Sequence, residues 1–316
     1  YATISGGKVK VEVVDPIPFS EAEDQAVAAG MRGAPIPTGE RVYFGLSGSN
    51  AIDGRESIPV FLEDREKFLE YDLTALILRL TREKKPMVGV VTNLPLDTGM
   101  GGLEAAMQGQ SQPFYIYEQL RLDFATQFLE QDFDRVPKDV DVLLIVHPKP
   151  LNQRTLYAID QFVMRGGRVF AMLDPLSELS QVRGPNGQPL AGSTLSSAES
   201  LGKVPESWGV AVEPKFVIGD QALAQRVQTG SGDGMADYVL WLSFPAANLD
   251  PKDRITANMQ ALNLGTVGEI NKLEKATTTV TPLIRTSPVT MEIPVEKAEN
   301  NPDPDELTRT FLSSNE

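Results

Sequence analysis

The stretch from Asp141 to Pro175 constrains the fold more than any other part of the chain, because its pattern is that of a complete β-α-β unit. Val142–Val146 is a continuous apolar run, which is typical of a parallel strand buried on both faces. Leu151–Arg165 then has the apolar spacing of a helix, and Gly166-Gly167 provides its C-terminal stop. Arg168–Leu173 predicts a second buried strand. The unit therefore favours an open α/β sheet.

The flanking sequence extends this unit to a larger module over residues 86–295. Apolar and alternating runs predict further strands at Val88–Thr92, Ala125–Leu129, Lys215–Ile218, Tyr238–Ser243 and Thr277–Leu283, with helices at Phe114–Phe124 and Ala198–Trp208. Two segments rich in glycine and polar residues, Asp97–Pro113 and Ser180–Ser197, are expected to be loops. Strands that alternate with helices in this way predict a mostly parallel, flavodoxin-like or class I amidotransferase-like sheet.

Residues 1–85 are predicted to form a smaller α/β module of order β-α-β-β-α. The elements are strand Lys8–Val14, a helix from the capping box Ser20/Glu23 to about Ala29, strands Arg41–Ser47 and Ser57–Leu62, and helix Asp64–Thr81. This is the order of the second half of a thioredoxin-like fold, with Ala34-Pro35 where such folds carry a cis-proline. A redox role is excluded because the chain has no cysteine.

Charge and cysteine content exclude several classes of function. The chain has 29 basic and 43 acidic residues, so its formal charge is 29 − 43 = −14. Nucleic acid and anionic lipid both require a positive surface, so neither is expected as the main partner. The absence of cysteine removes disulfides, thiolate metal sites and cysteine nucleophiles, and it suits an extracytoplasmic protein.

The two ends of the sequence suggest a piece of a longer protein. The chain begins at Tyr1 without a methionine, and no window reaches the roughly 18 apolar residues of a membrane span. Residues 296–316 are polar and are expected to be a tail or linker toward a missing membrane segment. We therefore expect the soluble fragment of a membrane-anchored parent protein.

Three polar residues follow predicted parallel strands and form the candidate ligand-binding site. Asn93, His147 and Asp174 each stand at or just beyond the carboxyl end of a strand. In open α/β sheets, ligands bind along this edge. His147 is the only histidine, so it is either a general base or a buried residue that closes its strand. Asp174 is either a ligand-binding acid or a turn cap.

No motif for a cofactor, metal or nucleotide accompanies these residues. Gly99–Gly102 lacks the spacing of a dinucleotide fingerprint and the lysine of a phosphate loop. Gly45–Ser49 lacks the final glycine of a serine-nucleophile elbow. Gln131–Asp134 lacks the glycine and glutamate of a calcium loop. We therefore expect no cofactor, no metal and no ATP hydrolysis by this chain.

Three long phrases resemble the auxiliary component of an ABC-type transport system linked to gliding motility, the GldG-like family, whose fold is related to an intraflagellar-transport domain. They are KVKVEVVDPIPFSEAEDQAVAAGM, FLEYDLTALILRLTREKKPMVGVVTNLPL and DVLLIVHPKPLNQRTLYAIDQFVMRGGRVFAMLDP, with TPLIRTSP (281–288) as a late landmark. The resemblance covers about residues 8–287. It implies a periplasmic part of a bacterial inner-membrane protein that works with a separate permease and a separate ATPase.

Together the residues and the resemblance predict a non-catalytic periplasmic domain that binds a small-molecule ligand or an envelope protein. Two alternatives stay open. The first is a hydrolase or transferase that uses His147 and Asp174, which requires a pocket holding both side chains within hydrogen-bond reach of each other or of a shared water. The second is a structural scaffold of the transporter, which requires no pocket at the strand ends and an exposed apolar patch elsewhere.

Overall fold

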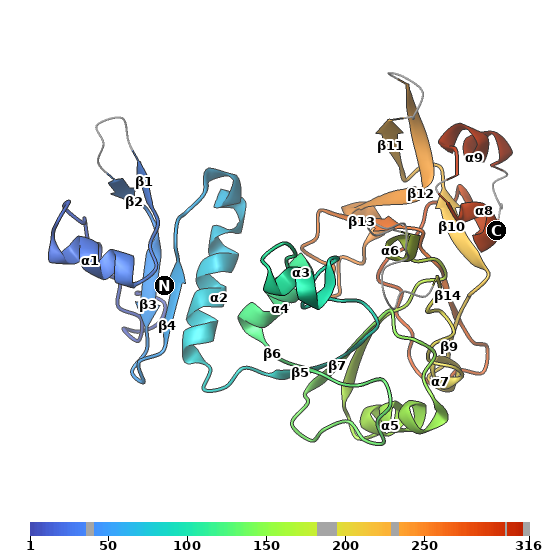
Figure 1. The fold of residues 1–316 in the computed structure, drawn as a ribbon, viewed down its shortest axis with the longest axis horizontal. Coiled ribbons are helices and arrows are strands. Elements are labelled where there is room, and N and C mark those ends of the chain that lie inside the picture. The colour runs from blue at the N-terminus through green and yellow to red at the C-terminus, as the bar shows by residue number, and fades with distance from the viewer. Residues whose placement is uncertain (36–40, 182–194, 229–233, 301, 312–316) are drawn as a thin grey trace. The chain divides into compact units, whose positions relative to one another are not determined.

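The computed structural model describes residues 1–35, 41–181, 195–228, 234–300 and 302–311. The chain divides into two compact units, Tyr1–Lys85 and Pro86–Glu316, which Figure 1 labels by element. The second unit confirms the α/β class, because a parallel sheet flanked by helices forms its first half. Most of the expected loop Ser180–Ser197 lies outside the described residues.

The first unit consists of two small antiparallel hairpins and two main helices. Its elements are α1 (Glu21–Ala28), β1 (Gly33–Pro35), β2 (Arg41–Tyr43), β3 (Leu46–Ser49), β4 (Arg55–Ile58), the 3-10 helix η1 (Glu63–Phe68) and α2 (Leu69–Thr81). The Ser20 hydroxyl accepts a hydrogen bond from Glu23 N, and the Glu23 carboxylate accepts one from Phe19 N, so a cap of the expected kind begins α1. Helix α2 packs on β3 and β4, and Gly48 allows the close approach, since a Cβ there would lie 2.8 Å from Leu80.

The expected first strand of this unit is wrong. Lys8–Val14 has no regular secondary structure, and Val13 is 93% exposed. An alternating segment forms a strand only where a neighbouring strand offers its backbone groups, and none of the described strands pairs with it. The order is therefore α-β-β-β-β-α instead of the thioredoxin-like β-α-β-β-α. No peptide bond among the described residues is cis, including the bond before Pro35.

A four-stranded parallel sheet begins the second unit. Its strands β5 (Met87–Thr92), β6 (Ala125–Phe128), β7 (Val142–Val146) and β8 (Arg168–Met172) lie in the order β6-β5-β7-β8. This is the flavodoxin-like order for the first four strands. The helices between them are α3 (Gly102–Met107), α4 (Tyr115–Asp123) and α5 (Gln153–Met164). Figure 1 shows α4 and α5 on opposite faces of the sheet.

The central strands β5 and β7 are buried on both faces, as their continuous apolar runs predict. The expectation of a second buried strand at Arg168–Leu173 is wrong, because β8 lies at the edge of the sheet and its Phe170 is 55% exposed. Leu143 and Ile145 pack toward α5 with Ile159 and Phe162, while Leu144 packs toward α4 with Tyr117. Asn152 caps α5 by accepting a hydrogen bond from Thr155 N. The β-α-β unit is thus present with nearly the predicted bounds.

The remainder of the second unit is antiparallel and not the continuation of the parallel sheet that we expected. Its strands form two antiparallel pairs and one antiparallel triplet. The elements of this part are α6 (Glu178–Gln181), α7 (Val204–Ser207), β9 (Val210–Val212), β10 (Phe216–Asp220), β11 (Ala224–Gln228), β12 (Met235–Pro245), η2 (Ala246–Asn248), β13 (Ala261–Gly265), β14 (Ile270–Lys272), β15 (Thr290–Pro294), α8 (Val295–Ala298) and α9 (Pro304–Thr310). The sheets are β10-β15, β11-β12-β13 and β14-β9.

Three local expectations in this half are also wrong. The helix expected over Ala198–Trp208 is only the short α7, because Gly202 has φ +51° and breaks the segment. Thr277–Leu283 forms no strand, apart from a single bridge that follows it at Ile284. The expected polar tail from residue 296 instead contributes α9, whose Leu307 is buried in a core with Val217 and Ile293. Burial of Leu307 explains why α9 forms in a mostly polar segment.

Candidate functional site

The three predicted site residues lie on one edge of the parallel sheet. The strand order reverses between β5 and β7, so Asn93 and His147, which directly follow these strands, flank the topological switch point. Asn93 N donates to His147 O at 3.3 Å, and His147 N donates to Met172 O at 3.0 Å. We call Asn93, His147 and Asp174 the rim. The parallel sheet therefore brings together residues that are far apart in sequence.

His147 is the buried member of the rim. Its side chain and backbone together are 1% exposed, and its φ of +41° places it in the left-handed region, which is uncommon for residues other than glycine. The ring nitrogen Nδ1 lies 3.8 Å from Asp174 Oδ2. This separation is longer than a hydrogen bond but within the range of an ion pair if the ring is protonated. His147 is thus directed at Asp174 from below the surface.

Asp174 presents its carboxylate at the surface of the rim. Its side chain is 44% exposed, and its backbone is held by the loop that follows. Asp174 N donates to the Ser197 hydroxyl at 2.9 Å, and Asp174 O accepts from the Ser196 hydroxyl and from Ser197 N and Ala198 N. Burial raises the pKa of Asp174, and the nearby charge of His147 opposes that rise.

Asn93 carries a buried donor without an acceptor. Its Nδ2 atom is inaccessible to solvent and has no hydrogen-bond partner among the described residues. A buried donor left in this state destabilises the fold by about 1–3 kcal/mol, so it calls for an acceptor such as a buried water or a bound ligand. Asn93 contacts His147 through the backbone, and no hydrogen bond between their side chains is present among the described residues.

Gln131 and a group of serines support the rim, and sequence patterns did not indicate them. Gln131 Nε2 donates to Thr92 O at 3.1 Å, and its Oε1 accepts from Lys149 N at 2.7 Å, so it joins the ends of β5 and β7. The Ser200 hydroxyl donates to Pro148 O at 2.8 Å. The only sequence signal was the serine-rich run 196–200 after β8, which by itself resembles any loop.

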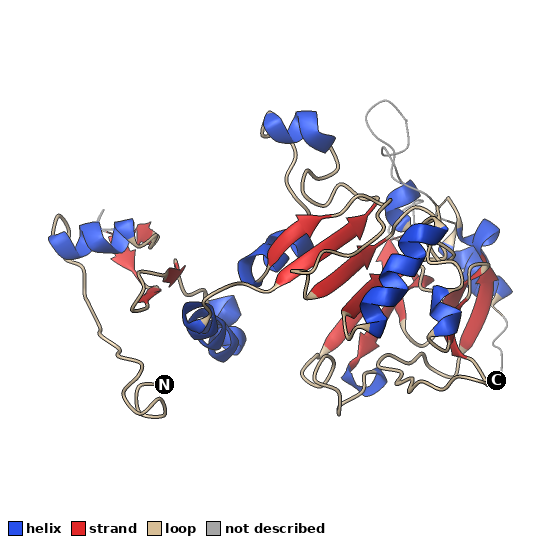
Figure 2. Cartoon of the chain, turned by 90° about the horizontal axis from the view of Figure 1, so that it is seen from below, coloured by secondary structure: helices blue, strands red, loops and turns tan. Residues whose placement is uncertain are grey.

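The loop Asp97–Pro113 next to Asn93 folds back on itself and contains α3. The Ser111 hydroxyl donates to Thr98 O at 2.7 Å and accepts from Gly101 N at 3.1 Å. Gly99 is required there, since its φ is +75° and a Cβ would collide with the carbonyl of Gln112. Figure 2 shows α3 projecting beyond the ends of the parallel strands, and its Leu103 and Met107 are exposed.

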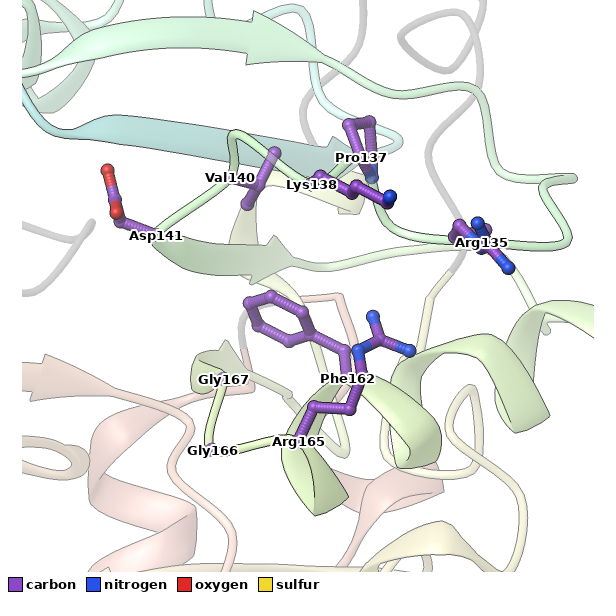
Figure 3. Close-up of a pocket in the computed structure, with 9 residues that line it drawn as sticks. All are labelled: Arg135, Pro137, Lys138, Val140, Asp141, Phe162, Arg165, Gly166 and Gly167. Carbon is purple, nitrogen blue, oxygen red and sulfur yellow. The ribbon is translucent and has the colours of Figure 1, made fainter.

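A cavity of about 710 Å³ opens at the other edge of the same sheet. It lies between the segment that leads into β7 and the end of α5 (Figure 3), and we call it the basic cavity. Its lining residues are Arg135, Pro137, Lys138, Val140, Asp141, Phe162, Arg165, Gly166 and Gly167. A smaller cavity of about 190 Å³ shares Arg135 and Arg165. Neither cavity includes a rim residue. Sequence reasoning missed the basic cavity because its cations come from two separate segments.

The described residues contain no group of three or more His, Cys, Asp or Glu side chains that could hold a metal ion. Among the same residues, no helix has the length and apolar character needed to cross a membrane.

Comparison with protein families identifies the second unit. A family model described as an ABC-type uncharacterized transport system, auxiliary component, matches residues 85–316. Comparison with curated proteins finds no match, and comparison with solved structures finds none either. The matched region contains the parallel sheet, the rim and the basic cavity, and it covers more than half of the sequence. The chain therefore belongs to this family of ABC-type transport system auxiliary components.

Proposed function

We propose that this chain is a non-catalytic, periplasmic domain of a membrane-anchored auxiliary subunit, and that it binds a ligand or an envelope protein through the rim. A separate permease and a separate ATPase of the ABC system supply the channel and the energy. The resemblance to the GldG-like family, including the phrases before residue 85, supports a link to gliding motility within the broader family.

The unpartnered Nδ2 of Asn93 at the switch point is the observation that carries the proposal. Because Nδ2 is buried, a ligand or partner accepts this hydrogen bond only once the Asn93 side chain turns toward the surface, and the bond then removes the penalty of the buried donor. The half-exposed Asp174 carboxylate stands on the same edge and can accept from the same ligand. Loops and strand ends at a switch point are where open α/β sheets bind their ligands.

Binding fits this geometry better than catalysis. A general base must reach the proton that it removes, whereas His147 is almost fully buried and faces Asp174. The serines nearest to Asp174 bond to backbone groups of the rim. They hold the loop in place, so none of them is arranged as a nucleophile next to His147.

A scaffold that binds only protein partners is the second candidate. One observation favours it: α3, in the loop that follows Asn93 in the chain, exposes Leu103 and Met107. An exposed apolar pair on a projecting loop suits a protein contact better than a small-molecule pocket.

A thermal-shift screen separates the two candidates. Sugars, amino acids, peptidoglycan fragments and divalent metals are added to the chain. A ligand at a hundredfold excess over its dissociation constant stabilises the native state by about 2.7 kcal/mol, which raises Tm by several degrees. The shift should disappear in Asp174→Asn and persist in Asp139→Asn, a matched change at an exposed acid of the same unit. If no compound shifts Tm, the small-molecule role is rejected and the scaffold role remains.

Location and partners are tested on the parent protein. Because this chain has no cysteine, Ala257→Cys adds one exposed thiol to it. A membrane-impermeant maleimide should label that thiol in intact spheroplasts, after any other cysteines are replaced by serine. Labelling only after lysis would refute a periplasmic location. Purification of the tagged parent from its own membranes should recover an ABC permease and ATPase, and their absence would refute the transport role.

A further inference from the structure

The basic cavity concentrates positive charge on a strongly acidic protein. Arg135, Lys138 and Arg165 are exposed at its wall, and within the described residues none of the three forms an ion pair. Like charges gathered in one place repel one another unless an anion joins them. Acidic residues outnumber basic ones in this chain, so a shortage of carboxylates does not explain why these three cations form no ion pairs.

The one acidic residue that lines the basic cavity is already engaged. Asp141 Oδ2 accepts a hydrogen bond from Met87 N at 2.8 Å and thereby fixes the start of β5 beside β7. In Figure 3 the Asp141 carboxylate points away from the three cationic side chains. Among the described residues, Asp141 therefore forms no ion pair with any of the three cations.

The remaining wall of the basic cavity is apolar and rigid. The ring of Phe162 and the side chain of Val140 belong to the main core, and Pro137 borders them. Gly167 sits against the ring, since a Cβ at that position would lie 2.5 Å from it. Side chains packed in this way keep their position, so the apolar wall is preformed for a ligand.

We propose that the basic cavity binds a small organic anion that joins a phosphate, sulfonate or carboxylate head to a flat apolar body. The head meets Arg135, Lys138 and Arg165, and the body lies on Phe162 and Val140. The cavity volume of about 710 Å³ is in the usual range for such ligands, about 300–1,000 Å³. This inference does not rest on the transport role, because the rim and the basic cavity share no residue.

A purely structural role accounts for only part of this arrangement. Arg165 directly follows α5, where a cation interacts favourably with the helix dipole. Arg135 and Lys138 lie in the segment before β7 and stand at no helix end. Their convergence on the same apolar wall is what a binding site for an anion requires.

A pair of fluorescent probes tests the proposal. The probe 8-anilinonaphthalene-1-sulfonate carries an anionic head on a flat apolar body, and N-phenyl-1-naphthylamine has the same body without the head. The sulfonate should bind the intact chain saturably at one site. The neutral probe should bind at least about tenfold more weakly, because it forms no charge-assisted bonds. No saturable binding, or equal affinity for both probes, would overturn the proposal.

Charge variants then locate the site. The double variant Lys138→Gln/Arg165→Gln should weaken sulfonate binding by about tenfold or more. The double variant Lys203→Gln/Arg254→Gln changes the net charge equally at exposed positions outside the basic cavity and should leave the affinity unchanged. Equal losses in the two double variants would show a general charge effect and reject the site. If Asn93→Leu, which removes the donor at the rim, abolishes binding while the cavity variants retain it, the anion binds at the rim and the proposal fails. Urea midpoints of all variants confirm that each is folded.

Discussion

Asp220 is a buried carboxylate that clamps the segment 285–288 to the end of β10. It is 0% exposed, and its two oxygens accept four hydrogen bonds. Oδ1 accepts from Ala222 N at 2.9 Å, from Leu223 N at 3.1 Å and from the Ser287 hydroxyl at 2.7 Å, while Oδ2 accepts from Ser287 N at 2.7 Å. We predict that this clamp is one of the strongest local contributions to the stability of the second unit.

The magnitude follows from the donors that each substitution leaves without an acceptor. Asp220→Ala leaves three backbone N–H groups without an acceptor, and of these only the N–H of Ala222 is exposed enough to reach water. The other two cost about 1–3 kcal/mol each, so we expect a loss of roughly 2–6 kcal/mol. Asp220→Asn keeps the oxygen that serves three donors but turns an amide toward Ser287 N, which should cost about 1–3 kcal/mol. Ser287→Ala removes the hydroxyl alone and should cost about 1 kcal/mol.

Urea denaturation followed by tryptophan fluorescence measures these losses. Both tryptophans, Trp208 and Trp241, lie in the second unit, so the signal reports the unit that contains Asp220. The control is Asp253→Ala, an acid whose side chain caps a surface turn through one bond to Ile255 N at 2.8 Å. If Asp220→Ala lowers the free energy of unfolding by no more than Asp253→Ala does, the clamp argument is refuted.

Three further predictions concern the rim and the basic cavity. Because burial raises the pKa of Asp174, its ionised form destabilises the fold. The stability of Asp174→Asn relative to wild type should therefore increase as pH rises above about 3.8. Urea titrations between about pH 4 and pH 7 measure this difference, and a constant difference would contradict the prediction. Asn93→Leu removes an unpartnered donor and should raise the free energy of unfolding by about 1 kcal/mol, whereas a loss of stability would point to a missed acceptor. Gly167→Ala places a methyl group against Phe162 and should lower the free energy of unfolding by about 1–3 kcal/mol. Gly166→Ala has open space but a φ of +87°, so it should cost less, about 1–2 kcal/mol. The reverse order in urea unfolding would refute the rigid apolar wall.

The parallel sheet was predictable because its signal is local. Val142–Val146 is a short apolar run bounded by polar residues, which is typical of a strand covered on both sides. The rim followed from the same argument, since the carboxyl ends of parallel strands meet at one edge. What the pattern could not predict is that Asn93 Nδ2 lacks an acceptor, because that depends on side-chain positions across β5 and β7.

The antiparallel half was predicted poorly for a different physical reason. Its strands pair over long sequence separations, such as β10 with β15, and single alternating runs do not identify their partners. Thr277–Leu283 alternates well but finds no partner strand among the described residues, and α9 forms because Leu307 is buried by distant residues. The Asp220 clamp was missed because an aspartate followed by Gln221 and Ala222 resembles an ordinary turn.

The rim and the basic cavity lie at opposite ends of the same strand, and this separation determines how the two can interact. Asp141 and His147 are six residue steps apart along β7, so at about 3.3 Å per step the two edges are roughly 20 Å apart. Between them Leu143 and Ile145 are fully buried in a packed core. Substitutions more than about 7–10 Å apart with no shared partner usually have additive effects. Asp174→Asn combined with Arg165→Gln should therefore change the free energy of unfolding by the sum of the single changes within about 0.5 kcal/mol. A larger deviation would mean that β7 moves as a switch between the two edges, and the rim and the basic cavity would then have to be treated as one coupled site.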